Sequence, residues 1–376
     1  MTRASADSMT PARNEIVLAH DRIVTLGPEV GRGTAAGVYR GILEGPYRIR
    51  RAVACKVYDV VATDDRDAVI TALARATRHA AFVQHPNVAG VYEFAVIRDA
   101  QPVVLSELVE GRPLTALIDA FAQKGRRLPL DLGLFLASEI AEGLLGAREA
   151  RTFEGMRLNM SHHDLSAREV LISWRGEVKI TDFGTGNAVR PASSIRTVRS
   201  LARRAATMPP EIARGRRGDA RSDVFSLGIL LREMLVGPRF AATTGDSAAF
   251  AYARDGHVEM SVLEPKLPEP VGSIVRRALE IDPVARYPHA GAMGYELRKA
   301  CLSMGVGDGR LFLKHAMNDM LGAPKIGNRD EEMTSRHESD APSRERLTDT
   351  SDSEPGASQP DSSDPDETAE MTAQDS

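Results

Sequence analysis

The chain has 376 residues, a hydrophobic content of 42% and a formal net charge of -4. This length allows one large domain or two smaller ones with a sizeable core. Cys55 and Cys301 form neither a metal-type spacing nor a CxxC motif, so we expect no disulfide framework or zinc site and a reducing, cytoplasmic setting. No apolar run is long enough to span a membrane, and the N-terminus lacks the apolar core of a secretory signal, so we expect no membrane anchor.

The charge is distributed unevenly along the chain. Residues 329–376 carry 15 acidic and 4 basic side chains, a net charge of -11 that leaves +7 on residues 1–328. Because this end of the chain is rich in Ser, Asp, Glu, Pro and Thr, we expect residues 325–376 to form a disordered acidic tail. The tail serves either solvation and tethering or transient contact with the basic body. The modest positive charge of the body does not by itself indicate nucleic-acid binding, and we expect none.

The first structured part of the chain reads as strands around a glycine-rich turn. Residues 1–20 are expected to be a flexible leader, and the alternating stretch IVTLGPEV then runs into GRGTAAGVYRG. Gly31 and Gly33 leave room for the backbone to approach phosphate oxygens, although glycine hairpins are common without any ligand. The next strand, RAVACKVYDV, carries Lys56, which either points to solvent or meets an anion.

Further along, the pattern changes from strands to helices. The segment from Asp64 to Gln84 predicts a helix rich in Ala and Arg, and two more strands and a linker follow it. Five strands and one helix would therefore make a small lobe. Helical patterns dominate from Pro113 onward, with LDLGLFLASEIAEGLLGAREA the longest, so we expect an α+β chain with a larger, mainly α-helical second lobe.

Two aspartates occur in the stretch MSHHDLSAREVLISWRGEVKITDFG. Asp164 precedes a short β-run at Val170–Ile172, and Asp182 follows another at Val178–Ile180. A turn between the runs brings both carboxylates to the same end. One is then placed to accept a proton and the other to bind a divalent cation. The alternative is that both aspartates only cap turns.

Seven motifs in this order resemble the protein kinase superfamily, specifically the bacterial Ser/Thr kinases of the eukaryotic type. The motifs are GRGTAAGVY, VACK, HHDLSAREVL, ITDFG, TMPPE, RSDVFSLG and DPVARY, and the resemblance runs from about Ile23 to Leu302. It implies a two-lobed protein-kinase-like fold, with a small antiparallel β-sheet lobe plus one helix at residues 21–107 and a larger helical lobe at residues 108–305. We expect a C-terminal helical extension at residues 306–324.

The resemblance also implies roles for individual residues. Lys56 would hold the α- and β-phosphates of ATP, Asp164 would orient and deprotonate the substrate hydroxyl, and Asp182 would bind Mg²⁺ or Mn²⁺. The adenine would lie between apolar side chains and the link between the lobes, at Val38, Ala54, Leu171 and the backbone of Glu107 and Val109. Ser106 would stand at the gate of a roomy rear cavity, and Glu211 would pair with Arg286.

Several positions depart from the family pattern. The acidic partner of the lysine falls at Ala76 or Arg75, so Lys56 needs another partner. The metal-binding Asn is Glu169, which still offers oxygen ligands but adds a negative charge.

The usual lysine of the catalytic loop is Ser166, and we hypothesise that the guanidinium of Arg204 reaches the site which that lysine leaves vacant. His163 replaces the arginine before Asp164, which weakens any anchor for a phosphorylated activation loop. That loop gathers hydroxyl residues and arginines that favour either solvent or an acidic partner, namely Arg190, Ser193, Ser194, Arg196, Thr197, Arg199, Ser200, Arg203 and Arg204.

Three functions fit these residues. The first is an ATP-dependent Ser/Thr protein kinase acting on protein substrates in bacterial signalling, supported by Lys56, Asp164 and Asp182. The second is a pseudokinase, a regulatory scaffold that binds nucleotide or partner proteins, supported by the departures. The third, a small-molecule kinase of the aminoglycoside phosphotransferase kind, does not predict the TMPPE and RSDVFSLG motifs. The sequence leaves the oligomeric state, the substrate and the upstream signal open.

Overall fold

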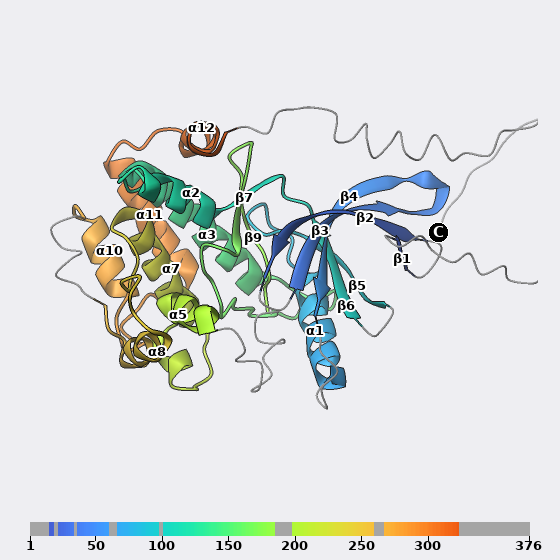
Figure 1. Ribbon diagram of the computed structural model, residues 1–376. Helices are drawn as coiled ribbons and strands as arrows, with labels where there is room; N and C mark the ends of the chain where they lie inside the picture. The colour runs from blue at the N-terminus through green and yellow to red at the C-terminus, as the bar shows by residue number, and fades with distance from the viewer. Residues whose placement is uncertain are drawn as a thin grey trace, which may run out of the picture. The chain divides into compact units, whose positions relative to one another are not determined.

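The computed structural model describes residues 15–18, 22–33, 36–59, 66–97, 101–184, 198–258 and 267–322. The predicted acidic tail lies outside these residues, as does most of the predicted leader. Within the described residues a sheet comes first and helices follow (Figure 1), which confirms the α+β, two-lobed expectation.

The N-terminal lobe is built on a six-stranded antiparallel sheet with the order β1-β2-β3-β4-β6-β5. The strands are β1 (Glu15–Val17), β2 (Ile23–Arg32), β3 (Ala36–Glu44), β4 (Arg50–Tyr58), β5 (Val91–Ile97) and β6 (Gln101–Glu107), with a 3-10 turn η1 (Pro46–Arg48) between β3 and β4. β4 lies between β3 and β6, and its Val53 and Cys55 are fully buried with Val103 and Leu105 of β6. The strand that carries Lys56 is therefore a central strand.

β1 corrects the expected extent of the leader, because it lies inside residues 1–20. It pairs antiparallel with β2, Ile16 opposite Val24. Ile16 is only 5% exposed and joins the apolar cluster of the sheet. Burial of this side chain outweighs the polar composition around it, so the lobe has one strand more than the five predicted.

One helix, α1 (Arg66–Ala80), packs against this sheet. It falls within the predicted 64–84 span. Leu73, Thr77 and Ala80 lie on its buried face at the spacing of one helical side. Arg75 is on the exposed face. The helix thus presents small and apolar groups, and no carboxylate, to the region beside β4 and β6.

The C-terminal lobe is mainly helical and carries a second, three-stranded sheet with the order β7-β8-β9. Its elements are β7 (Gly111–Pro113), α2 (Leu114–Gln123), α3 (Leu130–Glu149), β8 (Val170–Ser173), β9 (Val178–Ile180), α5 (Val198–Thr207), α6 (Pro210–Ala213), α7 (Ala220–Leu235), α8 (Asp246–Asp255), α10 (Val271–Ala278), α11 (Ala290–Ser303) and α12 (Gly309–Leu321). None of the described helices is both long and apolar enough to cross a membrane. α12 lies within residues 306–324, although the lobe boundaries stay predictions.

Two largely buried helices form the centre of this lobe. α3 is the 20-residue helix expected from its long apolar run, and it packs against α7 and α11. α7 is buried along most of its length, and a Cβ built on its Gly228 would come within 2.9 Å of the Ala278 side chain in α10. Only a residue without a side chain allows the two helices to approach this closely.

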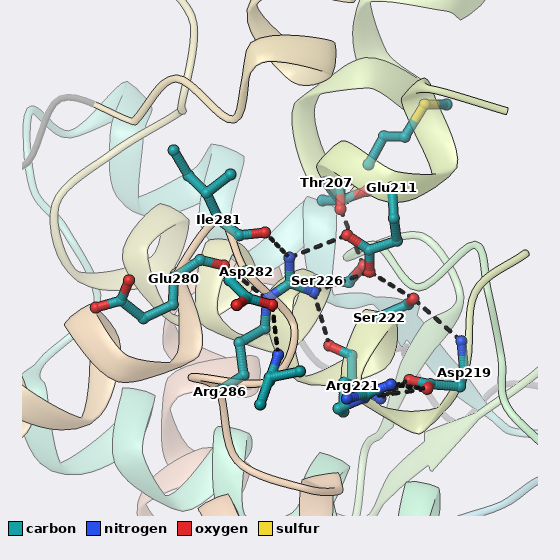
Figure 2. Close-up of polar contacts among 12 residues, drawn as sticks. Thr207, Glu211, Asp219, Arg221, Ser222, Ser226, Glu280, Ile281, Asp282 and Arg286 are labelled. Carbon is teal, nitrogen blue, oxygen red and sulfur yellow. Dashed lines mark hydrogen bonds and ion pairs between the residues drawn. The ribbon is translucent and has the colours of Figure 1, made fainter. Parts of the chain in front are cut away.

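The N-terminus of α7 is fixed by a saturated ion pair, and Figure 2 shows the contacts that surround it. Arg286 Nη1 and Nη2 donate to the two carboxylate oxygens of Glu211 at 2.8 and 3.0 Å, which confirms the predicted pair. The remaining donors of Arg286 reach the carbonyls of Glu280, Arg221 and Ile281 at 2.7, 3.1 and 3.1 Å. The Ser222 hydroxyl donates to the same Glu211 at 2.7 Å. Every N–H of a guanidinium that is only 2% exposed is thereby satisfied.

We expect Arg286→Ala to lower the free energy of unfolding by about 3–5 kcal/mol, because it leaves the buried Glu211 carboxylate without its cation. Burial opposes ionisation of Glu211, but hydrogen bonds from Arg286 and Ser222 lower its pKa overall. A lowered pKa in the folded state contributes stability that is present above the ordinary glutamate range and is lost as the pH falls through the folded value. The difference between wild type and variant should therefore shrink in acid.

Urea unfolding followed at neutral and acidic pH measures both effects. Arg221→Ala is the matched control, because Arg221 makes an exposed ion pair with Asp219 in the same network and should cost at most about 1 kcal/mol. Equal losses in the two variants would contradict the role given to Arg286.

Candidate active site

The two aspartates lie where the strand pattern predicted them, at the open end of a tight hairpin. β8 and β9 pair antiparallel, Leu171 opposite Lys179, which confirms the two predicted β-runs. Gly176 forms the turn with φ 79°, and a Cβ there would meet the Arg310 carbonyl at 2.4 Å, so glycine is required. The hairpin therefore brings the segments before β8 and after β9 to the same end.

Lys56 meets one of these aspartates directly. Its Nζ lies 2.6 Å from Asp182 Oδ2. Burial disfavours the charged ammonium, but the attraction of Asp182, together with the nearby Tyr58, raises the pKa of Lys56 above its ordinary value. The ammonium also lies 5.3 Å from the centre of the Tyr58 ring, within range of a cation–π contact.

Asp182 holds an uncommon backbone conformation, φ 64°, as aspartate does more readily than most residues. Strain of this kind persists where surrounding contacts fix it and is frequent at functional sites. The carboxylate is thus directed by its backbone as well as by Lys56.

The helix beside this pair offers Lys56 no acidic partner. The only acidic residue of α1 is Asp67 in its first turn. Ala76 lies beside Gly184 instead, since a Cβ built on Gly184 would be 3.6 Å from the Ala76 side chain. The carboxylate partner of Lys56 is therefore Asp182 and not a residue of α1. This agrees with the expectation that Lys56 needs another partner.

Glu169 is the third carboxylate near the hairpin. The Ser166 hydroxyl donates a short hydrogen bond to its Oε2. Burial raises the pKa of Glu169; the Ser166 hydrogen bond opposes this rise, whereas the charges of Asp182 and Asp164 add to it. Ser166, predicted only as a lost positive charge, thus positions Glu169.

Asp223 of α7 accepts hydrogen bonds from the loop that carries Asp164. The backbone N–H groups of His162 and His163 donate to the two Asp223 oxygens at 2.8 and 2.9 Å. Asp223 is 4% exposed, and burial raises its pKa. His163 has φ 64°, a conformation that costs energy and needs such support. One buried carboxylate thus accepts hydrogen bonds from the two residues before Asp164 and fixes their backbone.

Arg204 reaches Asp164 from α5. Its Nε lies 3.0 Å from Asp164 Oδ1, across 40 residues of sequence. This contact places the guanidinium beside the Ser166 loop, as hypothesised from the sequence. The other arginines and hydroxyl residues of the predicted basic loop, Arg190, Ser193, Ser194, Arg196, Thr197, Arg199, Ser200 and Arg203, lie outside the side chains that the structure describes.

The predicted nucleotide residues come from both lobes. In the sheet, Val38 is opposite Lys56, and Ala54 is opposite Ser106. The Gly33 amide donates to the Ala36 carbonyl at 2.8 Å. Gly31 is exposed near the end of β2, and the two residues after Gly33 are outside the described part.

Other predicted residues lie at the junction of the lobes. Leu171 is half-buried on β8, and Val109 lies between β6 and β7. The Glu107 amide donates to the Gly90 carbonyl at 2.8 Å, so this N–H is already satisfied within the protein. Its carboxylate pairs with Lys179 at 2.7 Å, which ties β6 to β9.

A cavity of about 40 Å³ lies beside Ser106. Its lining includes Lys56, Asp182, Thr77, Val104 and Phe183. The roomy rear cavity expected from the small Ser106 side chain stays a prediction. The buried Thr77 hydroxyl that faces this region has no hydrogen-bond partner among the described residues.

Tyr58 and Asp223 also contact residues of the candidate site, and the sequence analysis named neither of them. Tyr58 stands two residues after Lys56 on a strand, and this period of two indicates a shared face. Asp223 lies in the RSDVFSLG motif, one of the seven that carry the resemblance, and its own contact with a loop 60 residues earlier is set by tertiary packing. The first signal was available in the sequence, whereas the second depends on tertiary packing.

The donor set suits a nucleotide with a divalent cation. Mg²⁺ is commonly bound by one or two carboxylates together with phosphates and water, and Asp182 and Glu169 supply oxygens of that type. No group of three or more His, Cys, Asp and Glu side chains arranged to hold a metal occurs within the described ranges. Lys56 and Arg204 add positive charge on both sides of the carboxylates.

A small antiparallel sheet lobe, a helical lobe and a lysine–aspartate contact between them define a protein-kinase-like fold. Residues 24–290 match the family model for protein tyrosine and serine/threonine kinases. The kinase domain of PknI from Mycobacterium tuberculosis has a TM-score of 0.55 at 19% identity, covering 77% of this chain and 99% of that chain. That likeness shows the fold.

Curated relatives agree with this match. A probable serine/threonine-protein kinase of Streptomyces coelicolor is 31% identical over 74% of this chain and 39% of its own length. The serine/threonine-protein kinase PknL of Mycobacterium bovis is 32% identical over 72% of this chain and 63% of its own length. The tyrosine-protein kinase MasK of Myxococcus xanthus is 30% identical over 57% and 33%. The matched part thus spans less than two thirds of each of these proteins.

The chain belongs to the protein tyrosine and serine/threonine kinase family, and its relatives place it among the bacterial eukaryotic-type kinases. Use of ATP and a divalent metal, and action on proteins, are general properties that this family implies. The alternative of a pseudokinase is not favoured by relatives that are named as kinases.

We expect Glu169→Gln to raise the thermal midpoint at neutral pH in metal-free buffer. A raised pKa means that the ionised carboxylate is less favourable in the folded chain than in the unfolded chain, and a neutral amide of the same size removes that cost. The gain should vanish at a pH where glutamate is protonated in both states. The same variant should bind Mg²⁺ or Mn²⁺ more weakly.

Thermal unfolding across pH, with and without metal and nucleotide, measures this trade-off. The exposed Glu280 provides a control, since Glu280→Gln should change neither property. A Glu169→Gln variant that is less stable than wild type at neutral pH without metal would refute the expectation.

Proposed function

We propose that this chain is a serine/threonine protein kinase that transfers the γ-phosphoryl group of ATP to a protein hydroxyl. The observation that carries the proposal is the direct Lys56–Asp182 contact at 2.6 Å beside the hairpin that also presents Asp164. A cation for phosphates, oxygen ligands for a metal and an acceptor for a proton then occupy one site. These groups are what phosphoryl transfer requires.

Each residue has a distinct task in this proposal. Lys56 binds phosphate oxygens, and Asp182 and Glu169 provide oxygens to the divalent cation. A bound metal ion neutralises charge on the phosphates during transfer. Asp164 accepts a hydrogen bond from the substrate hydroxyl, orients its oxygen toward phosphorus and receives its proton. The apolar Val38, Ala54 and Leu171 hold the adenine, the backbone of Glu107 and Val109 meets its edge, and Gly31 and Gly33 approach the phosphates.

The departures from the family pattern do not remove any of these tasks. Lys56 retains a carboxylate partner without an acidic residue on α1. Glu169 keeps oxygen donors where the family has Asn, and Arg204 brings a positive charge to the loop that lacks a lysine. These contacts support the enzyme over the pseudokinase. A cytoplasmic location and a protein partner in signalling accompany the proposal as expectations.

We expect the purified chain to incorporate labelled phosphate from ATP into a basic or an acidic test protein with Mg²⁺ or Mn²⁺. Asp164→Asn should reduce the rate by at least about a hundredfold, because general-base positioning contributes this order of magnitude. Lys56→Met should have a similar effect through loss of phosphate positioning. Acid hydrolysis of the product distinguishes phosphoserine and phosphothreonine from phosphotyrosine.

Asp67→Asn is the matched control, since Asp67 is an exposed aspartate in the first turn of α1 and should leave transfer unchanged. ATP-dependent thermal stabilisation without any incorporation would instead identify a nucleotide-binding pseudokinase, because binding stabilises the native state without chemistry.

A further inference from the structure

Arg204 is the described cation closest to the predicted proton acceptor, and its contacts leave part of its guanidinium unused. Nε donates to Asp164 at 3.0 Å. Nη2 is buried and has no hydrogen-bond partner within the described residues. A buried charged donor without an acceptor is costly, and it commonly indicates a partner that the protein itself does not supply.

The segment around Arg204 is held firmly. Arg239 donates to the carbonyls of Ala205, Ala206 and Met208 at 3.4, 3.3 and 3.2 Å. The Ser226 hydroxyl donates to the Thr207 carbonyl at 2.9 Å. α7 and Arg239 thus fix the backbone immediately after Arg204. The backbone that carries Arg204 is therefore held independently of the contact between its guanidinium and Asp164.

The charges of the site show which ligand would suit the unused donors. Asp164, Glu169 and Asp182 are acidic, so an additional carboxylate would be repelled from this region. Lys56 is already engaged with Asp182. Ser166 carries no charge and donates its hydroxyl to Glu169. Near Asp164, the described group that can bind an anionic oxygen by charge and by directed N–H donors is Arg204.

We propose that Arg204 binds an oxygen of the terminal phosphoryl group of the donor nucleotide while its Nε stays on Asp164. This assignment rests on the proposed kinase function and adds a catalytic residue to it. The guanidinium of Arg204 then contacts both Asp164, which accepts the proton, and the phosphoryl group that is transferred. As the acceptor oxygen bonds to the γ-phosphorus and the bond to the β,γ-bridging oxygen breaks, ADP leaves and the hydroxyl proton passes to Asp164. Arg204 contacts the phosphoryl oxygens throughout.

A contact between Arg204 and the γ-phosphate would strengthen the binding of some nucleotides and not of others. Arg204 should distinguish nucleotides with a γ-phosphate from those without one. Titration calorimetry of the full chain with ADP and with the non-hydrolysable analogue AMP-PNP, at one fixed Mg²⁺ concentration, measures this difference. We expect Arg204→Gln to bind AMP-PNP about tenfold more weakly, the order of magnitude of one charge-assisted hydrogen bond, with ADP affinity unchanged.

Two further variants separate the alternatives. Arg204→Lys keeps the charge and should recover part of the AMP-PNP affinity, although it loses the planar fork of donors. Arg168→Gln removes an exposed arginine of the loop that carries Asp164 and should alter neither the ADP nor the AMP-PNP affinity. Thermal midpoints of all variants confirm that each is folded before it is titrated.

Several outcomes would overturn the assignment. If Arg204→Gln lost the same affinity for ADP and for AMP-PNP, the role of Arg204 would be structural. If it lost affinity for neither nucleotide, the proposed contact with the phosphate would be refuted. Unchanged affinities together with faster transfer would identify the Arg204–Asp164 pair as inhibitory. A wild type that binds both nucleotides but transfers nothing refutes the proposed kinase activity alone, because the γ-phosphate preference is still measured. A wild type that binds neither nucleotide refutes both.

Discussion

The active site depends on how a buried arginine fixes the start of one helix. Arg286 uses all of its donors on Glu211 and on three carbonyls, and the Ser222 hydroxyl joins Glu211 to α7. The first turns of α7 therefore cannot shift without exposing a charge. Asp223, the residue after Ser222, accepts hydrogen bonds from the backbone N–H groups of His162 and His163. The Glu211–Arg286 ion pair thereby helps to fix the loop that carries Asp164 through the first turn of α7.

The carboxylates and cations of the site are arranged in pairs that a nucleotide can reorganise. Lys56 rests on Asp182, Arg204 rests on Asp164, and Glu169 is held by Ser166 with a raised pKa. Three acidic side chains thus face two cations. A divalent ion bound here would compensate the excess negative charge, and phosphates would engage the cations. The family pattern has Asn where this chain has Glu169. The Glu169 carboxylate is supported here because it accepts a hydrogen bond from the Ser166 hydroxyl.

Much of the fold could be predicted because it depends on local patterns. The β8–β9 hairpin and the long α3 follow from strand alternation and from an apolar run, whereas the Glu211–Arg286 pair was implied by the resemblance to the kinase family. Arg204 was hypothesised to reach the site that a lysine would occupy at Ser166, because a missing charge in one motif coincided with a gained charge in another; its contact with Asp164 was seen only in the structure. The hydrogen bonds that Asp223 accepts and the pairing of strand β1 were not predicted, because each depends on how distant residues pack. Packing of that kind leaves no periodic signal in one sequence.

The absence of an acidic residue facing Lys56 from α1 changes what determines the position of this lysine. In the described structure, α1 meets the site through Ala76 beside Gly184, a contact without charge. Lys56 is instead fixed by its strand, since β4 pairs on both sides, Val38 and Val104 being its neighbours in the sheet. Tyr58, two residues on, supports the ammonium from the same strand. A movement of α1 therefore breaks no ion pair of Lys56, and the lysine keeps its place through the sheet and through Asp182.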